Sequence, residues 1–166
     1  ATDDPKKIKD ADTLILTTKV KDSVEALKEI SHLSSSLKLC LSLQNGLTKD
    51  EILLQKYGQN RVIGAATMEG AELLNYGEIE HTLPGITYFG ALGGEGDRIG
   101  AENSEKMKTV FNNAGLRAEV VDDIKSAEWA KLIRMASGAG LSILTRLEVY
   151  KMLKNFDISW CYVQLM

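Results

Sequence analysis

Two short segments decide the fold, Thr13-Leu14-Ile15-Leu16-Thr17-Thr18-Lys19 and Leu37-Lys38-Leu39-Cys40-Leu41-Ser42-Leu43-Gln44-Asn45-Gly46. Each is mainly apolar over the length of a strand and ends in polar residues, which predicts a fully buried strand. A third such strand is predicted over residues 61–67. Helical patterns fill both intervals, and strands joined by helices pair in parallel through right-handed crossovers. Continuous apolar runs, rather than alternating ones, predict a sheet that is covered on both faces.

The two helices between these strands carry start and stop signals. Asp22 opens the first helix, and Glu25 follows three residues later in a capping pattern. Thr48 and Glu51 predict a capping box for the second helix, which Gly58 ends.

The chain after residue 70 changes character, because glycines interrupt it and helical patterns follow. The patterns predict, in order, antiparallel edge strands over 78–82 and 86–89, a helix capped by Asn103 or Ser104 and ended by Gly115, a strand over 117–121, helices over 124–136 and 141–153, and an apolar tail over 158–166. The expected organisation is an α/β domain with an incomplete parallel sheet over residues 1–121, followed by the start of an all-helical domain over residues 122–166. The early first strand and the apolar final residues predict the middle of a longer chain.

Composition excludes several classes of function. The 166 residues hold Lys+Arg 20 and Asp+Glu 23, a formal net charge of −3, so a nucleic-acid partner is not expected. No apolar run reaches the ~18 residues of a membrane span. Cys40 and Cys161 lie far apart, and the two histidines are too few for a multi-histidine metal site. We therefore expect a cytoplasmic protein with no metal centre and no membrane or nucleic-acid partner.

Polar residues follow the first two predicted strands. Lys19 ends one strand and Asn45 the next, and ligands of open parallel sheets bind at the carboxyl ends of strands. Taken singly, Asn45-Gly46 is more simply a turn and Lys19 a solvated loop residue. Together they predict one crevice, in which an ammonium and an amide hold a carboxylate, a ribose or a carboxamide. His81 has no carboxylate at a useful spacing and is predicted to be a strand-edge residue.

Lys131 is the most informative single residue. The helix from Ile124 is predicted to bury Ile124, Ala127, Leu132 and Met135, and Lys131 lies on that face. Such a lysine either extends its ammonium to water or loses solvation, which lowers its pKa toward general-acid chemistry. The residues alone leave these two alternatives even.

Taken in order, these features resemble the ketopantoate reductase (2-dehydropantoate 2-reductase) family over nearly the whole chain. The resemblance is carried by the segments 12–19, 42–47, 61–64, 77–81, 114–116 and Trp129-Ala130-Lys131-Leu132. It implies an N-terminal Rossmann domain, a helical second domain and NADPH-dependent reduction of a 2-keto acid. The resemblance implies that Lys131 is the catalytic proton donor. It also implies that Thr18, Lys19 and Asn45 bind the cofactor and that Asn45 contacts the substrate as well.

Two positions depart from the family pattern. The family usually carries asparagines four and eight residues after the lysine, where this chain has Met135 and Ala139. These substrate-binding positions therefore lack amides, which indicates a different 2-keto acid or a weakened enzyme. A related reductase of other specificity and a non-catalytic relative that keeps the fold for binding are the alternatives. A homodimer through the helical domain is also implied.

Overall fold

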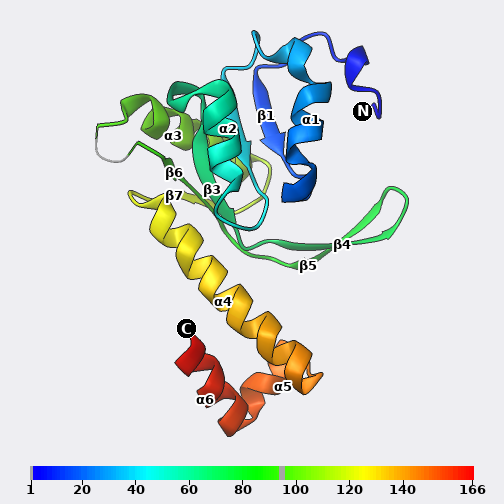
Figure 1. Ribbon diagram of the computed structural model, residues 1–166, viewed down its shortest axis with the longest axis vertical. Helices are drawn as coiled ribbons and strands as arrows, with labels where there is room; N and C mark the ends of the chain where they lie inside the picture. Colours follow the sequence, from blue (N-terminus) through cyan, green and yellow to red (C-terminus); the bar gives the residue numbers. More distant parts are fainter. Residues whose placement is uncertain (1, 94–95) are drawn as a thin grey trace. The chain divides into compact units, whose positions relative to one another are not determined.

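The computed structural model describes residues 2–93 and 96–166 (Figure 1). Its elements in chain order are η1 Pro5–Lys7, β1 Thr13–Leu16, η2 Val20–Asp22, α1 Ser23–Glu29, η3 Ser31–Leu33, β2 Leu39–Ser42, α2 Lys49–Tyr57, η4 Gln59–Arg61, β3 Ile63–Thr67, β4 Gly70–Asn75, β5 Glu78–Leu83, β6 Thr87–Ala91, α3 Arg98–Asn113, β7 Ala118–Val120, α4 Ile124–Thr145, α5 Val149–Lys154 and α6 Phe156–Leu165. Backbone packing divides them into two compact units, of which the first reaches Glu128 and the second is Trp129–Met166.

The first unit is built on the predicted strand–helix–strand order. β1 pairs in parallel with β2, from Thr13 opposite Leu39 to Leu16 opposite Ser42. A parallel bridge between Cys40 and Val62 joins β2 to the start of β3. β6 pairs antiparallel with β3 and parallel with β7. The parallel β1–β2–β3 arrangement is therefore confirmed, and β6 and β7 run in the opposite direction.

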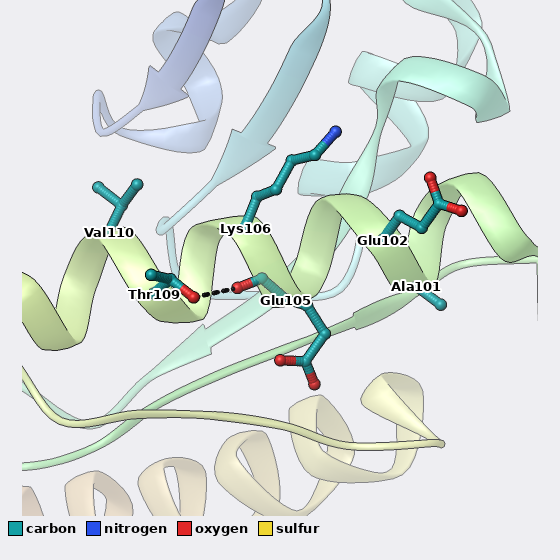
Figure 2. Close-up of a pocket in the computed structure, with 6 residues that line it drawn as sticks. All are labelled: Ala101, Glu102, Glu105, Lys106, Thr109 and Val110. Atoms are coloured by element: carbon teal, nitrogen blue, oxygen red, sulfur yellow. Dashed lines mark hydrogen bonds between the residues drawn. The ribbon is translucent and has the colours of Figure 1, made fainter.

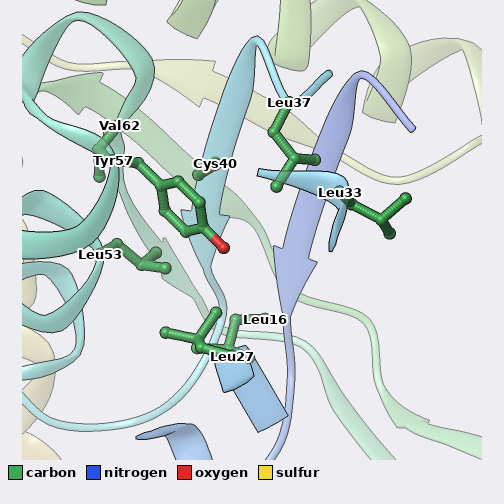
Figure 3. Packing of buried hydrophobic residues seen from close by; sticks show 8 residues of the cluster. All are labelled: Leu16, Leu27, Leu33, Leu37, Cys40, Leu53, Tyr57 and Val62. Carbon is green, nitrogen blue, oxygen red and sulfur yellow. The ribbon is translucent and has the colours of Figure 1, made fainter. Parts of the chain in front are cut away.

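Helices cover both faces of this sheet, as the apolar runs predicted. One core joins α1 and α2 to β1 and β2 (Figure 3), and its buried residues are Leu16, Leu27, Leu33, Leu37, Cys40, Leu53, Tyr57 and Val62. The other core joins α3 to β2, β3, β6 and β7. Leu39 and Leu41 belong to the second core and Cys40 to the first, because successive side chains of β2 point to opposite faces. In the second core, Phe89 and Phe111 meet edge to face with ring centroids 5.0 Å apart.

The prediction that the first strand is fully buried is wrong. Within β1 only Leu16 is buried, and the Ile15 side chain is 40% exposed. Among the described residues β1 pairs with β2 alone, and α3 packs on β3, β6 and β7 rather than over the Ile15 face.

The region after β3 also differs from the prediction. β4 and β5 form an exposed antiparallel hairpin, and β4 was not predicted. β6 is no edge strand, because it lies between β3 and β7 with Thr87 and Phe89 buried. No pattern of burial marks the hairpin, since every β5 residue and all of β4 except Gly70 are exposed.

One predicted helix cap and two predicted helix boundaries are wrong. Thr48 precedes α2 in helical backbone geometry and makes no capping hydrogen bond with its side chain. α3 begins at Arg98, because the Asp97 carboxylate accepts a 2.8 Å hydrogen bond from the Gly100 N–H. α4 continues to Thr145 through the predicted break at residues 137–140, since a glycine inside a long helix costs only about 1 kcal/mol.

The second unit consists of the rest of α4 with α5 and α6. The Asn155 carboxamide caps α6 by accepting from the Ile158 N–H at 3.1 Å. The Ser137 hydroxyl on α4 donates to the Leu165 carbonyl at 3.1 Å, which ties α6 to α4. None of the helices in the described part of the chain has the length and hydrophobicity that a membrane crossing requires.

Candidate active site

The carboxyl ends of β1 and β2 open into a pocket of about 400 Å³. The two strands end side by side, and the Leu43 N–H donates to the Leu16 carbonyl at 3.1 Å where they diverge. The pocket is lined by Thr17, Thr18, Lys19, Val20, Leu43, Gln44 and Asn45. The prediction that Lys19 and Asn45 share one crevice at neighbouring strand ends is therefore confirmed, and Thr18 lies in it too.

A buried side chain joins the two walls of this pocket. Gln44 is 7% exposed, and its Nε2 lies 2.6 Å from the Thr18 carbonyl, 3.1 Å from the Thr18 hydroxyl and 2.8 Å from the Ser23 hydroxyl. The Ser42 hydroxyl donates to Gln44 Oε1 at 3.0 Å and accepts from the Gln44 N–H at 3.2 Å. We call Thr18, Ser23, Ser42 and Gln44 the amide cluster.

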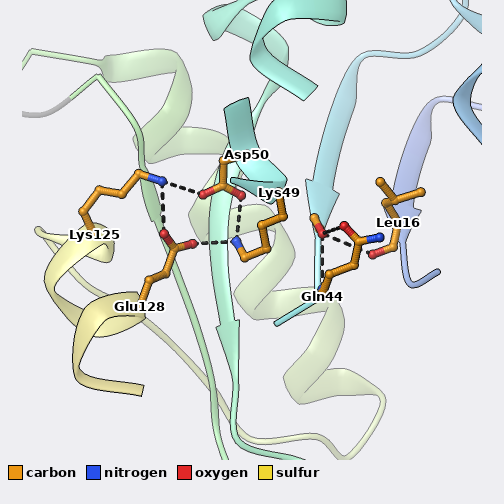
Figure 4. A network of polar contacts seen from close by, with 7 residues as sticks. Leu16, Gln44, Lys49, Asp50, Lys125 and Glu128 are labelled. Atoms are coloured by element: carbon orange, nitrogen blue, oxygen red, sulfur yellow. Dashed lines mark hydrogen bonds and ion pairs between the residues drawn. The ribbon is translucent and has the colours of Figure 1, made fainter. Parts of the chain in front are cut away.

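A second polar cluster lies at the N-terminal ends of α2 and α4. Lys49 contacts Asp50 at 2.7 Å and Glu128 at 2.6 Å, and Lys125 contacts the same two carboxylates at 2.8 and 3.0 Å (Figure 4). The side chains of Lys49, Asp50 and Glu128 are at most 2% exposed. We call these four residues the ion ring; its two positive and two negative charges balance, as buried charges require.

Burial and neighbouring charges act on the ion ring in opposite directions. Burial raises the pKa of the Glu128 carboxyl, and Lys49 opposes this rise while Asp50 adds to it. Burial lowers the pKa of Lys125, but Asp50 and Glu128 outweigh that effect, so the pKa of Lys125 is raised. Sequence reasoning missed this ring. Its only sequence signal is an opposite charge next to Lys49 and another three residues after Lys125, a spacing that usually marks a solvated helix surface.

The remaining predicted site residues lie in the second unit, on α4. Lys131, Met135 and Ala139 follow one another at successive helical turns. Lys131 is partly buried, whereas Met135 is 43% exposed and Ala139 is exposed. The predicted burial of Met135 is therefore wrong, and Ala127 and Leu132 are only partly buried. Large apolar residues further along α4, such as Ile143, are also exposed among the described residues.

Two other features are weaker candidates for a site. An open pocket of about 690 Å³ lies along α3 and is lined by Ala101, Glu102, Glu105, Lys106, Thr109 and Val110. Figure 2 shows these residues on the helix. The pocket is formed by the outer side of one helix and contains no buried polar group. At the base of the hairpin, His81 Nε2 lies 2.6 Å from Glu69 Oε2, so the prediction that His81 lacks a carboxylate partner is wrong. No cluster of three or more potential metal ligands occurs among residues 2–93 and 96–166.

The sequence and fold are similar to those of one family. Residues 1–94 match the profile of the family described as Ketopantoate reductase PanE/ApbA. A 2-dehydropantoate 2-reductase of Archaeoglobus fulgidus is 34% identical over 146 residues, which are 88% of this chain and 47% of that protein. The chain thus spans about half the length of this curated relative.

Solved structures agree with this match. A 2-dehydropantoate 2-reductase of Geobacter metallireducens superposes with a TM-score of 0.79 at 27% identity, over 93% of this chain and 50% of that one. A D-mandelate dehydrogenase, solved with NADH and anilino(oxo)acetate, superposes with a TM-score of 0.78 over 90% of this chain and 46% of that one. At 22% identity that likeness shows the fold alone. The predicted Rossmann-like α/β fold leading into helices is confirmed.

Proposed function

Because this chain belongs to the ketopantoate reductase family, we propose that the protein is a nicotinamide-dependent reductase of a 2-keto acid. The first candidate reaction is reduction of 2-dehydropantoate to pantoate, a step of pantothenate biosynthesis. One observation of the structure supports this proposal above others. The Lys19 and Asn45 side chains, which the family resemblance marks for cofactor binding, line one pocket at the carboxyl ends of parallel strands.

The residues of this pocket suit a nicotinamide cofactor. The Lys19 ammonium, the Thr18 hydroxyl and the Asn45 carboxamide offer a cation, a hydroxyl and a group that both donates and accepts. Such groups match the hydroxyls, carboxamide and phosphates of a dinucleotide. When bound, the reduced cofactor supplies the hydride. The preference for NADPH is part of the proposal and follows from the family resemblance alone.

Lys131 is proposed to supply the proton. Negative charge develops on the keto oxygen as the carbonyl is reduced, and a positioned ammonium stabilises that charge and then donates its proton. Asn45 would also hold the substrate by its amide. Met135 and Ala139 occupy the turns that follow Lys131 on α4, so neither offers a hydrogen bond to a substrate hydroxyl there.

Met135 and Ala139 also support a second candidate. A substrate without the hydroxyls of ketopantoate would lose nothing at these two positions, so a reductase for a more apolar 2-keto acid is the alternative. A non-catalytic relative that keeps the fold for binding is the remaining one. A homodimer through the helical unit and a cytoplasmic location are proposed as well, and sedimentation of the full-length protein tests the dimer.

The test is steady-state oxidation of NADPH by the full-length protein with ketopantoate and with other 2-keto acids. Lys131→Ala removes the proton donor, so we expect kcat to fall by about 10²–10⁴-fold on the best substrate, with cofactor affinity nearly unchanged. Lys154→Ala, at an exposed lysine of the same unit, is the matched control and should retain activity. Full activity of Lys131→Ala would overturn the mechanism, and absence of turnover with every keto acid would favour the non-catalytic relative.

A further inference from the structure

We propose that Gln44 is a positioning residue for cofactor binding, which it serves by fixing the segment that carries Thr18 and Lys19. The inference rests on the proposed function, because it assigns Gln44 a task in the same pocket. The main role of Gln44 in this proposal is not direct contact with the cofactor. Gln44 would hold the wall formed after β1 against the wall formed after β2.

The orientation of the Gln44 amide follows from its partners. The Thr18 carbonyl can only accept a hydrogen bond, so the group 2.6 Å from it must be the NH₂ of Gln44. Gln44 Oε1 then faces the Ser42 hydroxyl at 3.0 Å, where it accepts. One amide therefore joins Thr18, the second residue after β1, to Ser42, the last residue of β2, and its contact with Ser23 adds the first residue of α1.

This geometry acts on Lys19 through the backbone. Lys19 directly follows Thr18, so a hydrogen bond that holds the Thr18 carbonyl also limits the position of the Lys19 Cα atom, from which its side chain extends. Within the part of the chain that the structure describes, the Lys19 ammonium makes no ion pair with a carboxylate, so its charge is available to an anionic ligand. Thr18 itself is exposed, so water can replace the Gln44 amide there. We therefore expect a Gln44 variant to keep the fold but to hold Thr18 and Lys19 less firmly in place.

The first experiment measures NADPH affinity of the full-length protein by fluorescence titration. Gln44→Met keeps the length of the side chain and removes its donors, so Kd should rise by about tenfold, the change that corresponds to one hydrogen bond of ordinary strength. The KM for NADPH should rise with it, while kcat changes little. Gln55→Met, at an exposed glutamine of α2, is the matched control and should leave Kd unchanged. An unchanged Kd in Gln44→Met would overturn the inference.

A double-mutant cycle separates positioning from a general loss of structure. If Gln44 acts through Lys19, Gln44→Met should add almost nothing to the loss of affinity that Lys19→Ala causes alone. Fully additive losses would overturn the inference. An unchanged Kd in Lys19→Ala would overturn the cofactor assignment of the pocket and the inference with it. If Lys19→Ala binds NADPH more weakly while Gln44→Met binds it normally, the inference alone is overturned.

A second variant provides a readout that a merely structural role would not move. In Gln44→Glu an ionised carboxylate faces the Thr18 carbonyl, and only its protonated form can donate to that oxygen. The affinity of this variant for NADPH should therefore recover as the pH falls, relative to the unmodified protein at the same pH. Parallel pH profiles for the two proteins would overturn the inference, and this result does not depend on whether Gln44→Met folds well.

Discussion

The amide cluster and the ion ring are both largely buried polar networks of the first unit, but they differ in what they leave for a ligand. The ion ring encloses its own charges, since each of its lysines contacts both of its carboxylates. The amide cluster is uncharged and lies behind a pocket wall on which the Lys19 charge is left for a ligand. The charge-balanced ion ring therefore holds α2 and α4 together. The neutral amide cluster instead supports a pocket wall that presents the charge of Lys19, which is not part of the cluster.

The largest expected effect comes from opening the ion ring. Lys49→Met leaves the buried carboxylates of Asp50 and Glu128 with only the half-exposed Lys125 between them, so the free energy of unfolding should fall by about 3–5 kcal/mol. Gln44→Met in the amide cluster should cost only about 1–2 kcal/mol, because part of that cluster reaches water. Urea denaturation of the full-length protein, followed by circular dichroism, measures both, with Asp10→Ala at an exposed position as the control. Equal costs for the two clusters would remove the distinction drawn between them.

Removing one charge of each sign should restore part of this stability. Lys49→Met with Glu128→Leu leaves Lys125 paired with Asp50, so no buried charge is left without a partner. We expect the double variant to be more stable than the less stable single variant by about 1–4 kcal/mol. The same denaturation experiment measures this coupling. If the losses of unfolding free energy in the two single variants simply add in the double variant, charge balance is not the source of the stability of the ring.

The smallest effect is expected at Glu69, the surface counterpart of these two clusters. The Gly85 N–H donates to the Glu69 carboxylate at 2.9 Å and, with His81, holds the pKa of Glu69 below its ordinary value of 4.5. A lowered pKa in the folded protein contributes stability above about pH 4.5 and loses it as the pH falls through the folded value. Hydrogen exchange of β4–β5 amides, corrected for intrinsic rates, should therefore quicken below that pH, and Glu69→Gln should abolish the dependence.

The sequence predicted what depends on local pattern. Apolar runs located the parallel strands, and the polar residues that follow them located the Lys19–Asn45 crevice. What it missed depends on pairing across the chain. Lys49 meets Glu128 only after folding brings together residues that are 79 apart, and no local pattern encodes that contact. β4 was missed because an exposed ribbon has no buried side for a pattern to reveal.

The β4–β5 hairpin has one further consequence, for the behaviour of the protein in concentrated solution. Leu73 lies opposite Ile79, and Glu72 lies opposite Glu80. Because successive residues of a strand face opposite ways, these pairs make one side of the ribbon apolar and the other acidic. The two carboxylates repel one another weakly and repel any second ribbon that approaches from that side. Self-association would therefore begin on the apolar side of the ribbon, where no charge opposes it.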